Sequence, residues 1–371
     1  RKAIMRLAFR AASRAQQSCR ARDLARRRDG AVTNHNTRRA YAVSAASAPN
    51  VAREAMNIYY ADWATVTLPA GHRFPMDKYA ATRNALANDL QLRDKICLLP
   101  SPECSRGDLL TTHDQAYVDR VLNLELTDDD VRKIGFPMKR ENVVRSLAST
   151  GGTIQCARDA LRGGGALGRP RAAAQIAGGT HHAFRDRGEG FCVFNDIAVA
   201  INVIRGDPMY EASLRGRKIL IIDLDVHQGN GSAKIFENDE QVITFSMHGE
   251  RNYPLKTRET STHDVELPDD CDDATYLAEL NTWLPRLFIE YDPALVFFQA
   301  GIDALREDSF GRLAMTRAGM LTRNHAVYSQ CITRDLPLVI TMGGGYSKPI
   351  DASLDAHVDV FRSAAMRYGA P

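Results

Sequence analysis

The sequence predicts an α/β fold in which a mostly parallel sheet lies between two layers of helices. After residue 51, short apolar runs alternate with amphipathic segments up to about Tyr368. The run at 219–222 (ILII) is apolar without a break, as expected for a strand that is buried on both faces. Strands that alternate with helices are typical of parallel sheets covered by helices on both sides.

Five strands and two helices are predicted from local patterns. The strands are expected at 173–176, 218–223, 242–246, 295–299 and 338–342. Apolar residues with a helical repeat predict two helices, with Ile197, Ala200, Ile201 and Ile204 on one face of the first and Tyr276, Leu280, Leu284 and Leu287 on one face of the second. The glycine-rich stretch 162–174 is expected to form a surface loop.

The composition excludes several classes of protein. The chain has 371 residues, of which 44% are hydrophobic and 25% charged, as in ordinary globular proteins. It has no run of 18 apolar residues, so no membrane-spanning helix is expected. Seven cysteines without a CxxC pair argue against a disulfide framework or a cysteine zinc cage. Direct nucleic-acid binding is not expected, because the chain after residue 50 has a net charge of −7 and no long basic stripe.

The first 48 residues are expected to be a disordered organellar transit peptide. Residues 1–50 carry eleven Arg and one Lys against two Asp, and they lack the apolar core of a secretory signal. Residues 39–42 (RAYA) resemble a mitochondrial processing site. We therefore expect a mitochondrial protein, with a plastid address or an untargeted basic arm on a cytoplasmic protein as the alternatives.

Four predicted strands end in glycine-rich segments that carry polar residues. In open α/β sheets, ligands bind at the carboxyl ends of the strands. The four segments are 178–182 (GGTHH), 223–231 (DLDVHQGNG), 299–303 (QAGID) and 342–346 (MGGGY). Their glycines let the backbone turn sharply and approach a ligand closely.

A metal site is predicted from two of these segments. Alternate residues of a strand point to the same side, so Asp223, Asp225 and His227 begin on one side. A buried carboxylate is costly unless it is paired or bound to a cation. Asp225 and His227, together with Asp303, offer two carboxylates and an imidazole with room for water, which is typical of a catalytic zinc ion. For one segment alone, the alternative is a hydrogen-bonded strand end without a metal.

The paired histidines indicate acid–base chemistry. A tight glycine-supported loop allows both His181 and His182 to border one cavity. Asp223 is expected to accept a hydrogen bond from one of them, and Asn230 from the other without adding charge. The two rings would then differ in pKa, as acid and base roles require. Tyr346, after three glycines, is expected to stabilise a developing oxyanion.

Four further residues are expected to contact the substrate. Phe191 and the preceding Gly190 would form one wall of a narrow apolar channel, and Tyr253 the opposite wall. Gly344 is expected to lie against the substrate in the glycine segment before Tyr346. For Phe191, the alternative is an ordinary core position.

The order and spacing of these motifs resemble the zinc-dependent histone deacetylase family of the arginase/deacetylase superfamily. The resemblance covers about residues 55–367, which we interpret as one catalytic domain. The segment at 223–231 is most similar to the class IV branch, and those at 72–76 (HRFPM) and 246–249 (SMHG) are similar to its bacterial relatives. The resemblance implies a three-layer α/β/α fold with a central, mostly parallel eight-stranded sheet.

The resemblance also implies a cofactor and residue roles. One zinc ion per chain would be bound by Asp225, His227 and Asp303, and a structural potassium ion would lie near Asp223 and Ser246. His181 and His182 would form the acid–base pair, supported by Asp223 and Asn230, and Tyr346 would polarise the acyl carbonyl.

Two departures from the family pattern stand out. Many members carry a second histidine at the position of Gln228 and an aspartate at that of Asn230, and both changes here match a branch pattern. The surface aspartate with which some members orient a peptide backbone has no match near residues 62–76. Recognition of a histone tail therefore does not follow from the motifs.

The expected reaction is zinc-dependent hydrolysis of the amide bond of N-acyl-lysine in a protein or peptide. The first alternative is a deacetylase of small N-acyl amines such as acetylpolyamines, or an enzyme that removes longer acyl chains. A dinuclear manganese ureohydrolase would need further Asp and His ligands. A non-catalytic acyl-lysine-binding scaffold would be expected to lack a metal ligand or Tyr346. The sequence leaves the acyl length, the substrate and the oligomeric state open.

Overall fold

The computed structural model describes residues 55–164 and 171–369. These residues belong to the second of two compact units, Ala52–Pro371. The predicted transit peptide and part of the predicted loop at 162–174 lie outside the described residues.

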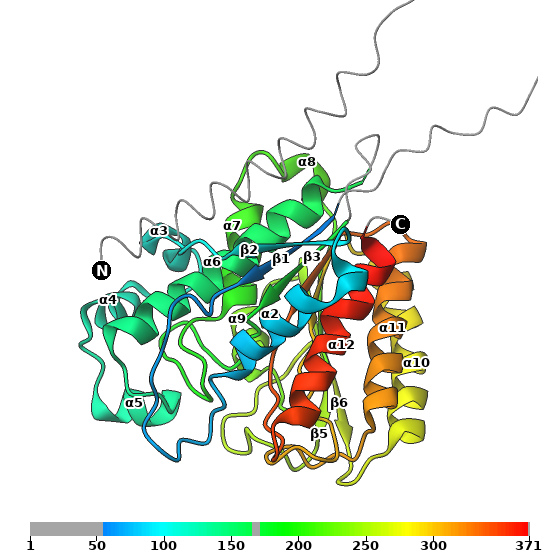
Figure 1. Cartoon of the computed structure of the whole chain (residues 1–371). Helices are drawn as coiled ribbons and strands as arrows, with labels where there is room; N and C mark the ends of the chain where they lie inside the picture. Colours follow the sequence, from blue (N-terminus) through cyan, green and yellow to red (C-terminus); the bar gives the residue numbers. More distant parts are fainter. Residues whose placement is uncertain (1–54, 165–170, 370–371) are drawn as a thin grey trace, which may run out of the picture. The chain divides into compact units, whose positions relative to one another are not determined.

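A single sheet of eight strands forms the centre of this unit (Figure 1). The strands are β1 (Met56–Tyr60), β2 (Ile96–Pro100), β3 (Ala172–Ile176), β4 (Ile219–Asp223), β5 (Val242–Gly249), β6 (His263–Leu267), β7 (Leu295–Gln299) and β8 (Leu338–Thr341). Their order in the sheet is β2-β1-β3-β8-β7-β4-β5-β6, and every neighbouring pair is parallel. The predicted parallel sheet is therefore confirmed.

Helices cover the sheet in two groups. One group is α2 (Lys78–Asn88), α10 (Asp273–Tyr291), α11 (Arg317–Thr333) and α12 (Asp351–Tyr368). In it α12 packs against α2 and α11, and α11 packs against α10, so the four lie side by side (Figure 1). In the other group, α6 (Arg140–Arg162) packs on β1, β3 and β8, and against α7 (Asp196–Arg205). This arrangement is the predicted three-layer α/β/α fold.

The remaining helical elements are shorter. They are the 3₁₀ turn η1 (Leu90–Leu92) and the helices α3 (Arg106–Leu110), α4 (Gln115–Asn123), α5 (Asp128–Ile134), α8 (Glu211–Leu214) and α9 (Asn230–Ile235).

The local patterns explain why the central elements form. All five residues of β3, β4 and β7 are buried, as predicted for continuous apolar runs. The helix α7 begins where the Asn195 side chain accepts a hydrogen bond from the Ala198 amide, and α10 begins with the same kind of cap from Asp272. The predicted apolar face of α10 is buried.

The three strands that the local patterns did not predict lie in the outer parts of the sheet. β2 and β6 are the two edge strands, and both are partly exposed. β1, which pairs with β2, mixes buried and partly exposed residues. Polar residues interrupt the apolar pattern in β1 and β6, whereas β2 (ICLLP) is apolar throughout and carries the same local signal as the central strands.

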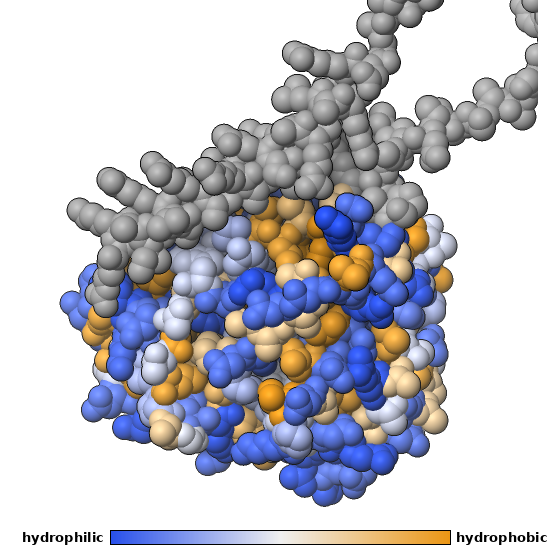
Figure 2. Space-filling view, in the orientation of Figure 1, coloured by the Kyte–Doolittle hydropathy of each residue, from blue (hydrophilic) through white to orange (hydrophobic). Residues whose placement is uncertain are grey.

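The surface carries no single large apolar face in the view of Figure 2, where hydrophilic and hydrophobic side chains are interspersed. The most exposed large apolar side chains, Leu90, Leu255 and Ile289, come from separate segments. Among the described residues, no helix has the length and apolar character needed to cross a membrane.

The sheet order brings the four polar segments together. They follow β3, β8, β7 and β4, which are consecutive neighbours in the sheet. Asp223 is in register with Gln299, and Gln299 is in register with Thr341. Because the strands are parallel, all four segments emerge at the same edge of the sheet, where a ligand site is expected.

Candidate active site

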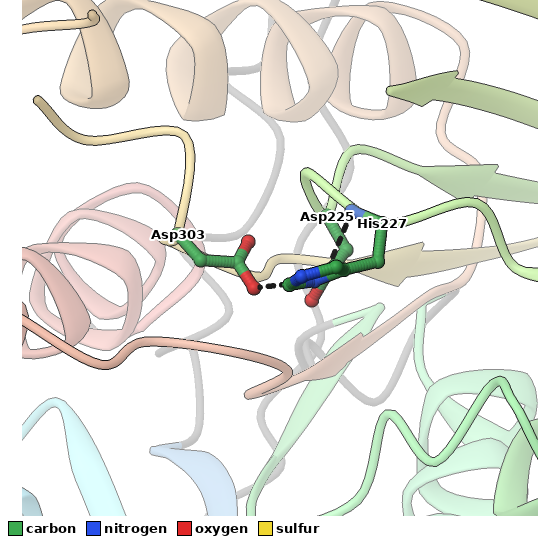
Figure 3. A group of neighbouring side chains, drawn as sticks. All are labelled: Asp225, His227 and Asp303. Carbon is green, nitrogen blue, oxygen red and sulfur yellow. Dashed lines mark hydrogen bonds and ion pairs between the residues drawn. The ribbon is translucent and has the colours of Figure 1, made fainter. Parts of the chain in front are cut away.

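Three side chains form a buried group that could hold a metal ion. They are Asp225 and His227, after β4, and Asp303, after β7. The ligand atoms that they offer all lie within 4.8 Å of one another. His227 Nδ1 lies 2.9 Å from Asp225 Oδ1 and 3.1 Å from Asp303 Oδ2. Figure 3 shows the imidazole between the two carboxylates.

The chemistry of this group fits a divalent cation. Asp303 is fully buried, and apart from the ion-pair contact with His227 its Oδ2 has no hydrogen-bond donor among the residues that the structure describes. Burial and the nearby Asp225 carboxylate raise the pKa of Asp303 to about 7. A metal ion would remove this cost by accepting a lone pair from each side chain. A side chain on Gly301 or Gly344 would collide with these carboxylates, so both glycines keep the space open.

The loop that carries the two histidines is anchored by a buried carboxylate. Gly178 and Gly179 follow β3 with left-handed backbone angles, φ +73° and +76°. Asp196, at the start of α7, accepts hydrogen bonds from the Gly179 amide at 3.1 Å and the Thr180 amide at 2.7 Å. This anchor and the two glycines turn the chain so that adjacent histidines face one site.

The two imidazole rings lie together with centroids 4.1 Å apart, and each has its own partner. His181 Nδ1 is 2.6 Å from Asp223 Oδ2. His182 Nδ1 is 2.7 Å from Asn230 Oδ1. The structure therefore pairs each histidine with a supporting residue named from the sequence.

The partners separate the two rings in pKa. Burial lowers the pKa of both rings, but the carboxylates of Asp223 and Asp225 raise the pKa of His181 to about 9. Among the described residues the hydrogen-bond partner of the His182 ring is the Asn230 amide rather than a carboxylate, and burial and the nearby His181 hold its pKa well below the ordinary value. One ring is thus suited to carry a proton and the other to accept one.

Tyr346 is held over the site by a glycine loop after β8. Its backbone amide donates to Asp308 Oδ2 at 2.6 Å. The Lys78 ammonium lies 4.8 Å from the centroid of the Tyr346 ring and contacts the carbonyls of Gly343 and Gly345 at 3.3 Å each. Burial and the carboxylates of Asp303 and Asp225 raise the pKa of the Tyr346 phenol well above its ordinary value. The phenol therefore stays protonated and can donate a hydrogen bond.

Phe191 projects from a tight turn toward the site. Both central residues of this turn, Gly190 and Phe191, have left-handed backbone angles, φ +58° and +67°. Such an angle is strained for phenylalanine. The Phe191 ring lies 6.2 Å from the Tyr346 ring and 5.1 Å from Phe74. The structure thus places Phe191 in an aromatic cluster beside Tyr346.

Tyr253 lies on the histidine side of the site. Its ring is edge-on to His182 at 5.0 Å, and the residue is 42% exposed. Gly190 touches both, because a Cβ there would come within 3.0 Å of each ring.

Gly344 lies deeper than we expected for a substrate contact. Its amide donates to Asp225 Oδ2 at 2.9 Å, beside the proposed metal ligands. Ser246 lies next to Asp223 in the sheet register, as the predicted potassium site requires, and the ion itself stays a prediction.

The sequence reasoning missed four residues that position the site: Lys78, Glu189, Asp196 and Asp308. Asp196 ends the segment 190–196 (GFCVFND), which begins with Gly190 and Phe191, and Asp308 follows Asp303 by five residues. The position of these acidic residues, in or near the motif segments, could have identified them from the sequence. Lys78 gave none, because nothing in its local sequence separates it from a solvent-exposed helical lysine.

A family model described as "Histone deacetylase domain" matches residues 72–361. The chain belongs to the histone deacetylase family. This membership and the fold agree with the resemblance seen in the motifs, within the arginase/deacetylase superfamily.

Individual relatives agree. The chain is 38% identical over 308 residues to an uncharacterized protein of Picosynechococcus, covering 83% of this chain and 97% of the relative. It is 29% identical over 286 residues to Histone deacetylase 2 of Arabidopsis thaliana, covering 75% and 70%. A solved histone deacetylase homologue in complex with SAHA has a TM-score of 0.68 at 21% identity, with 84% of each chain covered. The structural similarity shows the shared fold.

Proposed function

We propose that this protein is a zinc-dependent deacetylase that hydrolyses the amide bond of acetyl-lysine in proteins or peptides. One observation carries the proposal. A buried Asp-His-Asp group lies beside two histidines with opposite pKa shifts and a phenol that stays protonated. These parts match the needs of amide hydrolysis by an activated water molecule.

Asp225, His227 and Asp303 would hold the zinc ion. When bound, zinc supplies a Lewis acid that polarises the acyl carbonyl and lowers the pKa of water. His182, neutral and with its Nδ1 engaged by Asn230, accepts the proton of the attacking water at Nε2. Tyr346 donates a hydrogen bond to the developing oxyanion.

Departure of the amine needs a proton. His181, paired with Asp223, carries a proton at neutral pH and donates it to the leaving lysine amine. The Asp223 carboxylate, 2.6 Å from His181 Nδ1, raises the pKa of this ring and so supports its protonated form. The acid and base roles thus belong to different rings, as their opposite pKa shifts favour.

One feature favours acetyl-lysine over polyamines. Phe310, which packs on Tyr346 at 4.8 Å, carries the Arg73 guanidinium 5.1 Å from its ring centroid. A cation at this position repels a polyamine.

The decisive experiment measures zinc content and amine release on a panel of acyl-lysine peptides and acetylpolyamines. We expect one zinc ion per chain and release of lysine from acetyl peptides. Release only from polyamines would keep the chemistry and replace the substrate. No divalent metal and no turnover on any acyl amine would contradict the proposal and favour the scaffold alternative.

Tyr346→Phe tests the role of the phenol. Loss of the hydroxyl should lower kcat by at least about 10²-fold, the usual scale for one oxyanion donor. Zinc content should not change, because the phenol is not among the proposed ligands. Unchanged turnover in this variant would overturn the role assigned to Tyr346.

We also propose that residues 1–48 direct the protein to mitochondria. Their Arg-rich, acid-poor composition supports this address. A fluorescent protein fused behind residues 1–48 should enter mitochondria, whereas plastid or cytoplasmic fluorescence would replace the proposed location.

A further inference from the structure

We propose that Glu189 is a positioning residue that sets the tautomer of His182 by fixing the orientation of the Asn230 amide. The proposal rests on the function proposed above, in which His182 acts as the base. It adds a third member to the pair of His182 and Asn230, and Glu189 reaches the ring only through Asn230.

Glu189 is a buried carboxylate that gathers several donors. It is 4% exposed, and its Oε1 accepts hydrogen bonds from Asn230 Nδ2 at 2.8 Å, Tyr253 OH at 2.9 Å and Thr257 Oγ1 at 2.9 Å. Its other oxygen faces Arg187 Nε at 3.8 Å. One oxygen atom therefore holds three polar side chains in place.

These contacts leave the Asn230 amide one orientation. The Nδ2 group donates to Glu189 Oε1 and to the Thr257 carbonyl, at 2.8 and 2.9 Å. Both partners are acceptors in this geometry, so the flipped amide would set its oxygen against two oxygens. Asn230 is fully buried, and a buried group left unpaired is costly. The amide oxygen must therefore face His182.

The orientation of the amide determines which nitrogen of His182 carries the proton. Asn230 Oδ1 only accepts hydrogen bonds, so His182 Nδ1, 2.7 Å away, must donate. A neutral imidazole has one N–H, and Nε2 is then left with its lone pair. This is the form that a general base needs, and it arises without a carboxylate beside the ring.

The turn that carries Phe191 also places Glu189. The Cys192 amide donates to the Glu189 carbonyl at 2.9 Å, and the Gly190 amide donates to the Lys133 carbonyl at 3.0 Å. A Cβ on Gly190 would come within 2.7 Å of the His182 ring. The turn thus brings Glu189 under Asn230, which is 41 residues away in sequence.

Two conservative variants of Glu189 test separately the position of its hydrogen-bond-accepting oxygen and its negative charge. Glu189→Gln keeps an oxygen in the Oε1 position, loses the charge and points its amino group toward the partly exposed Arg187 side. Glu189→Asp keeps the charge but withdraws the oxygen by one methylene, beyond hydrogen-bond distance. Thr257→Val is a matched control, because it removes one donor to Glu189 and a long 3.4 Å contact to Asn230 Nδ2 but leaves the carbonyl that holds Asn230 at 2.9 Å.

The test combines kinetics with imidazole ¹⁵N NMR of the zinc-loaded full-length chain. The His182 signals are assigned by comparison with His182→Asn. We expect the Nδ1–H tautomer in the wild type, Glu189→Gln and Thr257→Val, with kcat within about 3-fold. In Glu189→Asp we expect a mixture of tautomers and a kcat roughly 10-fold lower, with KM within about 2-fold.

Several results would overturn the proposal. They are an Nε2–H tautomer in the wild type, an unaltered His182 spectrum in Glu189→Asp, or a loss in Glu189→Gln as large as that in Glu189→Asp. An Nε2–H tautomer in the wild-type spectrum would overturn the proposal even if a variant does not fold. The spectrum also needs no turnover, so a failure of the proposed function remains distinct from a failure of this positioning role.

Discussion

The two histidines of the pair are both buried imidazoles, but their hydrogen-bond partners differ. His181 and His182 are 3% and 4% exposed. His181 contacts a carboxylate directly, whereas His182 contacts an amide with a carboxylate one hydrogen bond further out. Burial alone would lower the pKa of both rings. The difference between them therefore comes from the distance of the negative charge.

The largest effects are expected when each imidazole is removed in turn and hydrolysis is measured on substrates with different leaving groups. His182→Ala should slow hydrolysis of both an acetyl-lysine peptide and an acetyl nitrophenyl ester by at least about 10²-fold, because both need the base. His181→Ala should lose a similar factor on the peptide but less than about 10-fold on the ester, since a phenolate leaves without a proton.

Steady-state kinetics on both substrates, with zinc content measured for each variant, provide the check. Equal losses on the ester in the two variants would remove the division of acid and base roles.

A smaller effect is expected when His182, like His181, is given a carboxylate as its partner. Asn230→Asp places a carboxylate against Glu189 Oε1 and the Thr257 carbonyl, where Asn230 now donates at 2.8 and 2.9 Å. We expect kcat to fall roughly 10-fold, the usual scale for a residue that supports a catalytic side chain through a hydrogen bond, and the melting temperature to fall with it. Kinetics and thermal unfolding measure the two changes.

A second substitution tests the cause of that loss. Adding Glu189→Gln to Asn230→Asp replaces the repelling carboxylate by a neutral amide, which in this background can turn its amino group toward position 230, and should restore most of the stability. If Asn230→Asp alone is as stable and as active as the wild type, this result would contradict the role assigned to the Asn230 amide as the partner of His182.

The sequence predicted the centre of this molecule better than its outer parts. Fully buried strands such as β4 and β7 have continuous apolar runs, and the polar residues at their ends mark the site. The edge strand β6 lacks such a run, whereas β2 (ICLLP) has one and was missed all the same. The motifs identified His182 and Asn230. Glu189 contacts Asn230, which is 41 positions away in sequence, only because a turn of the folded chain brings the two together. Contacts of this kind depend on tertiary packing.

A third buried histidine provides a neutral reference for the pair. His113 Nδ1 lies 2.8 Å from the Phe184 carbonyl, and its Nε2 accepts the Asn195 amide at 3.0 Å. Burial lowers the pKa of His113 to about 4. The unfolded chain binds a proton here from pH 6.5 downward while the folded chain does not, so folding stability falls as the pH drops from 6.5 toward 4.

His113→Gln removes this contribution and keeps one donor and one acceptor. The stability advantage of the wild type over this variant should shrink by on the order of 2 kcal/mol between pH 7.5 and 5. Urea unfolding of both proteins across this range measures the difference. Parallel stability curves would show that His113 is not held neutral.

The most direct test of the account is a zinc titration of the metal-free protein, followed by lysine release from an acetyl-lysine peptide. We predict that activity rises linearly to one equivalent of zinc per chain and then stays level, and that Asp303→Asn regains little activity at one equivalent. Full turnover without metal, or a requirement for two metal ions, would contradict the assignment of Asp225, His227 and Asp303 as a single catalytic zinc site.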